Sequence, residues 1–185
     1  MTDQSSAAAL RPALAKLATE PESLTARKLW KALSVAERTQ ALEAALAADE
    51  QGVATVRVQS ALIKGKKYRP QTVTAMNRKK LAMELAPVPV DDSYLIDSAL
   101  IDFHFAHRRP MMAAFLDHLG IPHEEGRLGE DVAEHLPTPE RLRAAADALV
   151  TRFPPDELYT YFLTLVLQDR QTWGALGEWM AARGG

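Results

Sequence analysis

The sequence predicts an all-α fold, either a multi-helix bundle or a stack of helical hairpins, with about eight helices and no significant sheet. Leu and Ala account for 55 of the 185 residues, whereas Val and Ile account for only 14. Unbranched side chains lose little rotamer freedom in a helix, whereas β-branched side chains suit strands. Apolar residues also recur at helical spacing, with prolines and capping residues between the segments that carry them.

Residues 10–50 predict three helices that form one antiparallel layer. The leucines of 10–19 have the spacing of a short amphipathic helix, and Ser23 can cap the next one. Ser34 followed by Glu37 has the form of a capping box, in which each residue satisfies a backbone N–H of the other. We therefore expect the third helix to begin directly after Ser34.

Residues 53–63 fit either a strand or a helix, because their valines alternate while other apolar residues fall at helical spacing. A single strand would have nothing to pair with, so we expect a helix. The following residues, 64–70, read as a mobile basic loop. Pro70 suits a first helical position and predicts one helix that extends to residue 85.

Residues 87–92 are the best candidate for a linker. Pro87 and Pro89 each remove a backbone donor and restrict the preceding residue, so a helix cannot continue through them. This divides the chain into an N-terminal layer, 1–86, and a C-terminal helical body, 93–185. One continuous domain is the alternative.

Residues 92–123 predict two consecutive helices joined at Pro110, with apolar stripes that face a core. The second helix is expected to end at Gly120. After it, residues 124–137 read as a polar connection with one helical turn near 130–135. Thr138 followed by Pro139 signals another helix start, and two further helices follow.

Composition limits the chemistry and the compartment. The chain has no cysteine, which excludes disulfides and cysteine-based catalysis and allows a reducing compartment. The N-terminus lacks the pattern of a secretory signal, and the most apolar segment, 158–167, is too short to span a bilayer. We therefore expect a cytoplasmic protein that does not enter a membrane.

Charge is distributed unevenly along the chain. Residues 51–90 carry eight basic groups and one acidic group, whereas 91–185 carry eight basic and sixteen acidic groups. Within 64–80, hereafter the basic segment, there is no acidic residue. Its cations are Lys64, Lys66, Lys67, Arg69, Arg78, Lys79 and Lys80.

The basic segment predicts a non-enzymatic interaction or adaptor protein that binds an acidic protein partner. The first alternative is an accessory protein that binds nucleic acid nonspecifically, because lysines can neutralise phosphates without reading bases. Tyr68 could stack on a base, but one tyrosine is not an aromatic platform, and the overall pI near 6.2 argues against a dedicated nucleic-acid binder.

Arg108 and Arg109 precede the second helix of 92–123 and have two interpretations. An arginine fork near the backbone donors of a helix start suits a phosphate or another anion. Alternatively, the two arginines pair with carboxylates of the acidic half, such as Asp97 or Asp102, and we favour this reading because carboxylates outnumber bases there.

The histidine-rich stretch is the second alternative basis for function, as a metal-dependent enzyme. All five histidines lie between 104 and 135, and the candidate metal ligands are His104, His107, His118 and His123. The stretch contains no HExxH motif and no pair of ExxH motifs. The spacing favours a core-edge histidine at 107 and a helix-terminal one at 118, while His123 next to Glu124 could act as a general base.

No candidate nucleophile is marked, so we expect binding rather than catalysis, with no cofactor. Aromatic residues near the C-terminus could also form a self-association surface. These are Tyr159, Tyr161, Phe162 and Trp179.

Overall fold

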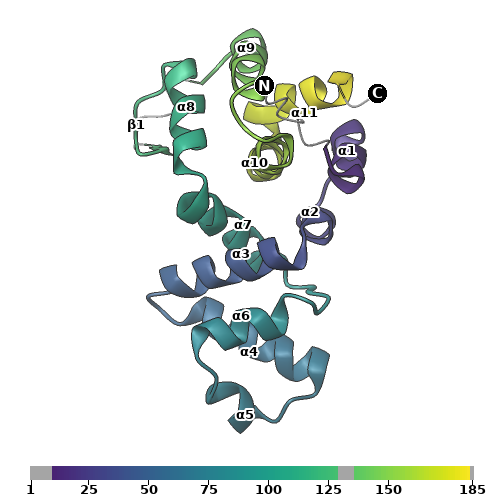
Figure 1. Ribbon diagram of the computed structural model, residues 1–185, viewed down its shortest axis with the longest axis vertical. Coiled ribbons are helices and arrows are strands. Elements are labelled where there is room, and N and C mark those ends of the chain that lie inside the picture. Colours follow the sequence, from purple (N-terminus) through teal and green to yellow (C-terminus); the bar gives the residue numbers. More distant parts are fainter. Residues whose placement is uncertain (1–9, 129–135, 184–185) are drawn as a thin grey trace, which may run out of the picture. The chain divides into compact units, whose positions relative to one another are not determined.

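The computed structural model describes residues 10–128 and 136–183, and they are predominantly helical (Figure 1). The predicted all-α class is confirmed, and the only sheet in these residues is a pair of two-residue strands. The described residues contain eleven α-helices rather than about eight, together with one 3₁₀ helix. None of these helices combines the length and the apolar character that a bilayer crossing requires.

The helices form two compact units. The middle unit is Ala26–Arg108, and the terminal unit joins the described residues of the two ends of the chain, 10–25 with 109–128 and 136–183. The predicted division at 87–92 stays a prediction. Within the middle unit, that segment buries Val88 and Val90.

Six helices make up the middle unit. These are α2 (Ala26–Ala32), α3 (Val35–Ala48), α4 (Val53–Lys66), α5 (Pro70–Thr74), α6 (Arg78–Leu85) and α7 (Ser93–His107). Helix α3 packs against both α6 and α7, α2 packs on α7, and α4 contacts α5 and α6 (Figure 1). Leucines dominate the core of the unit, where Leu42, Leu62 and Leu85 are completely buried.

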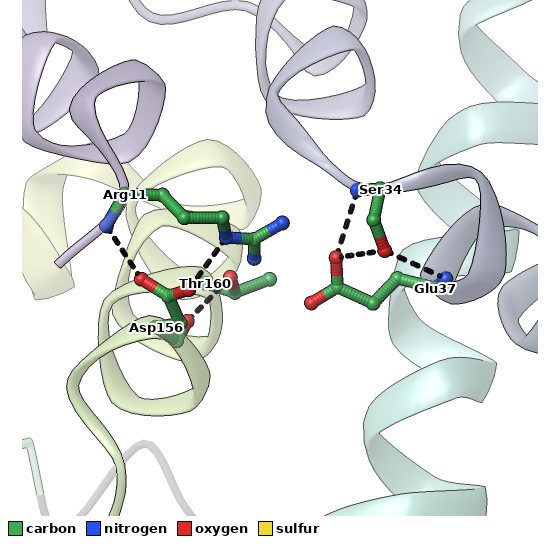
Figure 2. A network of polar contacts seen from close by, with 5 residues as sticks. All are labelled: Arg11, Ser34, Glu37, Asp156 and Thr160. Atoms are coloured by element: carbon green, nitrogen blue, oxygen red, sulfur yellow. Dashed lines mark hydrogen bonds and ion pairs between the residues drawn. The ribbon is translucent and has the colours of Figure 1, made fainter. Parts of the chain in front are cut away.

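The capping box predicted at the start of α3 is present (Figure 2). The Ser34 backbone N–H donates to Glu37 Oε2 at 2.8 Å, and the Glu37 backbone N–H donates to Ser34 Oγ at 3.2 Å. Two backbone donors that the helix itself cannot satisfy are thus paired, and this sets the first turn of α3.

Three local expectations in the middle unit are resolved. Residues 53–63 are helical, as expected, but α4 continues to Lys66, so the prediction of a loop over 64–66 was wrong. Lys67 then adopts a left-handed conformation, φ 57°, and ends the helix. The single helix predicted over 70–85 was also wrong, because the Asn77 side chain accepts from the Lys80 N–H at 2.9 Å and starts a separate helix.

The terminal unit contains five α-helices and the small hairpin. Its elements are α1 (Pro12–Thr19), η1 (Pro21–Ser23), α8 (Arg109–Leu119), β1 (His123–Glu124), β2 (Arg127–Leu128), α9 (Pro139–Val150), α10 (Pro155–Gln168) and α11 (Arg170–Arg183). The hairpin was not predicted. The helical turn expected near 130–135 lies outside the described residues. The helices that follow it agree with the prediction.

An aromatic cluster joins three helices of the terminal unit. The Phe115 ring centroid lies 5.2 Å from that of Phe162 and 6.1 Å from that of Trp173, so α8, α10 and α11 meet at one point. Tyr159 and Trp179 are also buried, at 5% and 6% exposure. These side chains therefore build the core and do not form the self-association surface expected from the sequence.

The N-terminal helix is held to the same unit by a polar contact (Figure 2). The Arg11 backbone N–H donates to Asp156 Oδ1 at 2.8 Å, and Arg11 Nε lies 2.6 Å from Asp156 Oδ2. The hydroxyl of Thr160 bonds the Asp156 carbonyl one turn later. The start of α1 is thereby fixed to the first turn of α10, where a carboxylate is favourable to the helix dipole.

Candidate anion-binding site

The basic segment spans three helices and two connections of the middle unit. Lys64 and Lys66 lie in the last turn of α4, Lys67 and Arg69 follow before α5, and the remaining three cations begin α6. Because α4 contacts both α5 and α6, the helices that carry these cations are neighbours (Figure 1). The structure therefore gathers the basic segment in one part of the middle unit.

Most of these cations remain exposed and without a carboxylate partner. Lys66 pairs with Glu84, Nζ to Oε2, at 2.6 Å. No carboxylate in 10–128 or 136–183 lies within ion-pair distance of the other six, and all six are exposed. The positive charge of the segment is thus largely uncompensated by the described parts of its own chain.

Glu84 is the single acidic residue of 51–90, and it has two partners. Besides the ion pair with Lys66, its Oε2 accepts a hydrogen bond from the Tyr68 hydroxyl at 2.8 Å. The hydrogen bonds from Lys66 and Tyr68 lower the pKa of Glu84, and the bond to Glu84 raises the pKa of Tyr68. Tyr68 is partly exposed, but its hydroxyl is bonded to Glu84, and Lys66 Nζ lies over its ring, 5.8 Å from the centroid.

The first turn of α6 carries three consecutive cations, Arg78, Lys79 and Lys80. A helix N-terminus has the positive end of the backbone dipole and favours acidic side chains there, so cations at this place oppose helix stability. The Asn77 cap supports the helix start in spite of them. Their charges and the dipole together give this turn a positive field that attracts anions.

We find no match to this chain among protein-family models, curated proteins or solved structures.

A groove borders the basic segment, and sequence reasoning did not identify it. It lies between α4 and residues 88–92 and has a volume of about 590 Å³. Its lining consists of Arg57, Ser60, Ala61, Lys64, Gly65, Val88, Pro89, Val90, Asp91 and Asp92. A Cβ on Gly65 would lie 2.7 Å from Val88 Cγ1, so the glycine permits this close approach. A glycine inside a helix was the sequence signal that could have indicated it.

The two carboxylates of the groove are both neutralised. Asp92 Oδ2 lies 2.7 Å from Arg57 Nη1, and Asp91 Oδ1 lies 3.2 Å from Arg27 Nη2. Burial raises the pKa of Asp92, but the N–H of Leu95 and the Arg57 guanidinium outweigh it, and the net shift is downward. The lining itself carries two basic and two acidic side chains, so its formal charge is zero. Lys64 is the one charged side chain of the lining that has no ion pair in the described residues, and Arg27 brings a further positive charge to Asp91 from outside the lining.

Arg108 and Arg109 do not belong to the basic segment, and they lie in different units. Arg108 stacks on the ring of Phe103, with its guanidinium carbon 5.2 Å from the ring centroid. Arg109 forms an ion pair with Glu125, a carboxylate of the acidic half, which favours the pairing interpretation for Arg109. Burial raises the pKa of both Asp97 and Asp102.

The histidines occupy dissimilar environments. His104 is 2% exposed, and burial lowers its pKa to about 3. His107 is exposed, so the prediction of a core-edge histidine at 107 was wrong, and His104 is the buried histidine of this helix. These two lie in the middle unit, while the exposed His118 and the largely buried His123 lie in the terminal unit. Within the described ranges, no three His, Asp or Glu side chains are grouped as metal ligands.

His123 has partners on both ring nitrogens. The Gly126 N–H donates to Nδ1 at 3.1 Å, and Nε2 lies 3.1 Å from Asp117 Oδ1. This arrangement assigns the ring proton to Nε2 and gives His123 a structural role in the hairpin that follows α8. The enzyme hypothesis stays a prediction.

Proposed function

We propose that this chain is a non-enzymatic helical interaction protein that binds an acidic protein partner through the basic segment. One observation carries the proposal: six of its seven cations are exposed and make no ion pair with the described residues. Like charges held this close repel one another, and three of them also oppose the dipole of α6. An acidic partner would remove both costs on binding.

A protein partner accounts for the surroundings of the segment better than nucleic acid does. The partly exposed Tyr68 is the one aromatic side chain of the segment, and Lys66 Nζ lies over its ring, whereas base stacking needs a set of free aromatic faces. The chain as a whole has a net charge of −2, which repels a polyanion away from the segment. A partner with a local acidic surface would experience the positive field without this long-range repulsion.

The test is a matched pair of charge reversals, with a short glutamate-rich peptide as the probe of a local acidic surface. Lys79→Glu with Lys80→Glu places two acids in the first turn of α6, where the dipole favours them. This offsets the repulsion between an acid at position 80 and Glu84 one turn later, so folding should suffer little. Lys16→Glu with Lys31→Glu makes the same change in charge at exposed positions outside the segment. We expect salt-dependent binding in the wild-type protein, loss in the first variant and retention in the second.

The proposal fails if the wild-type protein does not bind the glutamate-rich peptide at low ionic strength, or if both variants lose binding equally. Single- and double-stranded oligonucleotides are measured in parallel at the same ionic strength. Tighter binding to oligonucleotides, with a steep decrease as salt rises, would replace the protein partner with nucleic acid.

A further inference from the structure

We propose that the groove between α4 and residues 88–92 binds an acidic peptide segment of the partner and receives one aliphatic side chain of that segment. This inference rests on the proposed function and specifies the chemistry of the partner. It combines three features of the middle unit: an apolar groove floor, neutralised carboxylates at one end and an unpaired lysine at the other.

The floor of the groove is suited to an apolar side chain. No polar side-chain atom comes from Ala61, Gly65 or Val88, which line the groove. Because Gly65 has no side chain, Val88 can approach the backbone of α4 closely at this position. The volume of about 590 Å³ falls in the range in which pockets hold ligands of moderate size. An aliphatic side chain that enters the groove would be transferred from water to a largely apolar surface, which favours binding.

Charge selects an acidic segment. Asp91 and Asp92 already have arginine partners, so they do not require a cation from the ligand. Lys64 lines the groove without an ion pair in the described residues, and the exposed Lys67 follows it along the chain. Carboxylates of a bound segment would therefore lie toward the C-terminal end of α4, where they continue onto the basic segment.

The outward face of α4 supports the apolar part of this chemistry. Val56 is 60% exposed and lies one turn before Ser60 on the same helix face. Tyr94 is 57% exposed, and its ring lies 4.5 Å from the Arg57 guanidinium carbon. Exposed apolar side chains thus adjoin the end of the groove opposite Lys64, so a partner with both aliphatic and acidic groups would cover surfaces of both kinds.

The experiment uses the full chain and two labelled peptides of equal charge. One is a short glutamate-rich peptide with a central leucine, and in the other serine replaces the leucine. Ser60→Trp fills the groove from an exposed position without a change in charge, and Gln40→Trp makes the same addition on the exposed face of α3. Burial of one leucine predicts roughly tenfold tighter binding of the leucine peptide to the wild-type protein.

We expect Ser60→Trp to abolish the preference for leucine while leaving weaker, salt-sensitive binding of both peptides, and Gln40→Trp to preserve the preference. Amide NMR shifts caused by the leucine peptide should include those of Ser60, Ala61 and Gly65. Equal affinity of the two peptides for the wild-type protein, or shifts confined to residues 67–80, would overturn the groove proposal alone. No binding of either peptide at low salt would overturn the proposed function as well.

Discussion

Lys66 and Glu84 form an ion pair, Nζ to Oε2 at 2.6 Å, that joins the end of α4 to α6. The pair is three-quarters buried, with 28% of each side chain exposed. Lys66 therefore differs from the other cations of the basic segment, because Glu84 neutralises its charge within the fold. Variants that probe binding should therefore retain Lys66.

Glu84→Gln should lower the free energy of unfolding by about 0.5–1 kcal/mol near neutral pH, because it removes a partly exposed ion pair and weakens the bond from Tyr68. The pKa of Glu84 is lowered in the fold, so its contribution is present above the unfolded-state pKa and is lost as pH falls through the folded-state pKa. Urea denaturation at neutral and acid pH measures both effects. Glu43→Gln on α3 is the control, and a difference that persists in acid would contradict the account.

Asp92 both caps α7 and pairs with Arg57. Its Oδ1 accepts from the Leu95 N–H at 3.1 Å, and its Oδ2 lies 2.7 Å from Arg57 Nη1. Asp92→Ala should cost about 1–2 kcal/mol, whereas Asp92→Asn keeps a capping acceptor and should cost less than about 1 kcal/mol. Because the pKa of Asp92 is lowered, the deficit of the Ala variant should shrink as pH falls below the ordinary aspartate range. Equal losses in the two variants would show that the cap contributes nothing.

The burial of His104 should make the protein sensitive to acid. Its pKa of about 3 in the fold lies below the ordinary value of 6.5, so the unfolded chain binds the proton first as pH falls. Stability from this group is complete above about pH 6.5 and declines toward pH 3, by up to about 1.4 kcal/mol per pH unit. His104→Gln should flatten the decline measured by denaturation at several pH values. The exposed His107→Gln serves as the control, and an unchanged slope in His104→Gln would refute the prediction.

Alanine substitutions at Gly126 and Gly52 distinguish the cost of backbone strain from the cost of steric conflict. Both have positive φ, 86° and 76°, but a Cβ on Gly126 would lie 2.7 Å from Met112 Cβ, whereas a Cβ on Gly52 meets nothing within 4 Å. Gly52→Ala should cost about 1 kcal/mol through conformational strain alone. Gly126→Ala should cost about 2–4 kcal/mol, because the hairpin must also move away from α8. Thermal denaturation of the two variants compares them directly, and similar losses would mean that the hairpin adjusts freely.

Local signals in the sequence predicted the helices well where one cap or proline decides the outcome. The Ser34–Glu37 box was predictable because both partners lie within one turn, so their spacing alone indicates the bond. The break at Asn77 was missed because the apolar spacing of 70–85 also fits one uninterrupted helix. The hairpin around Gly126 depends on close packing against α8, which no local pattern reports.

From the sequence by itself came the helical class and the concentration of positive charge in the middle of the chain, because rotamer preference and charge are properties of the residues themselves. The tertiary structure alone decided that Lys66 is neutralised while Lys64 is not, that His104 rather than His107 is buried, and that a groove lies beside α4. The physical reason is that ion pairs, burial and cavities depend on which distant segments meet. Glu84 reaches Lys66 from 18 positions along the chain, and Asp92 reaches Arg57 from 35.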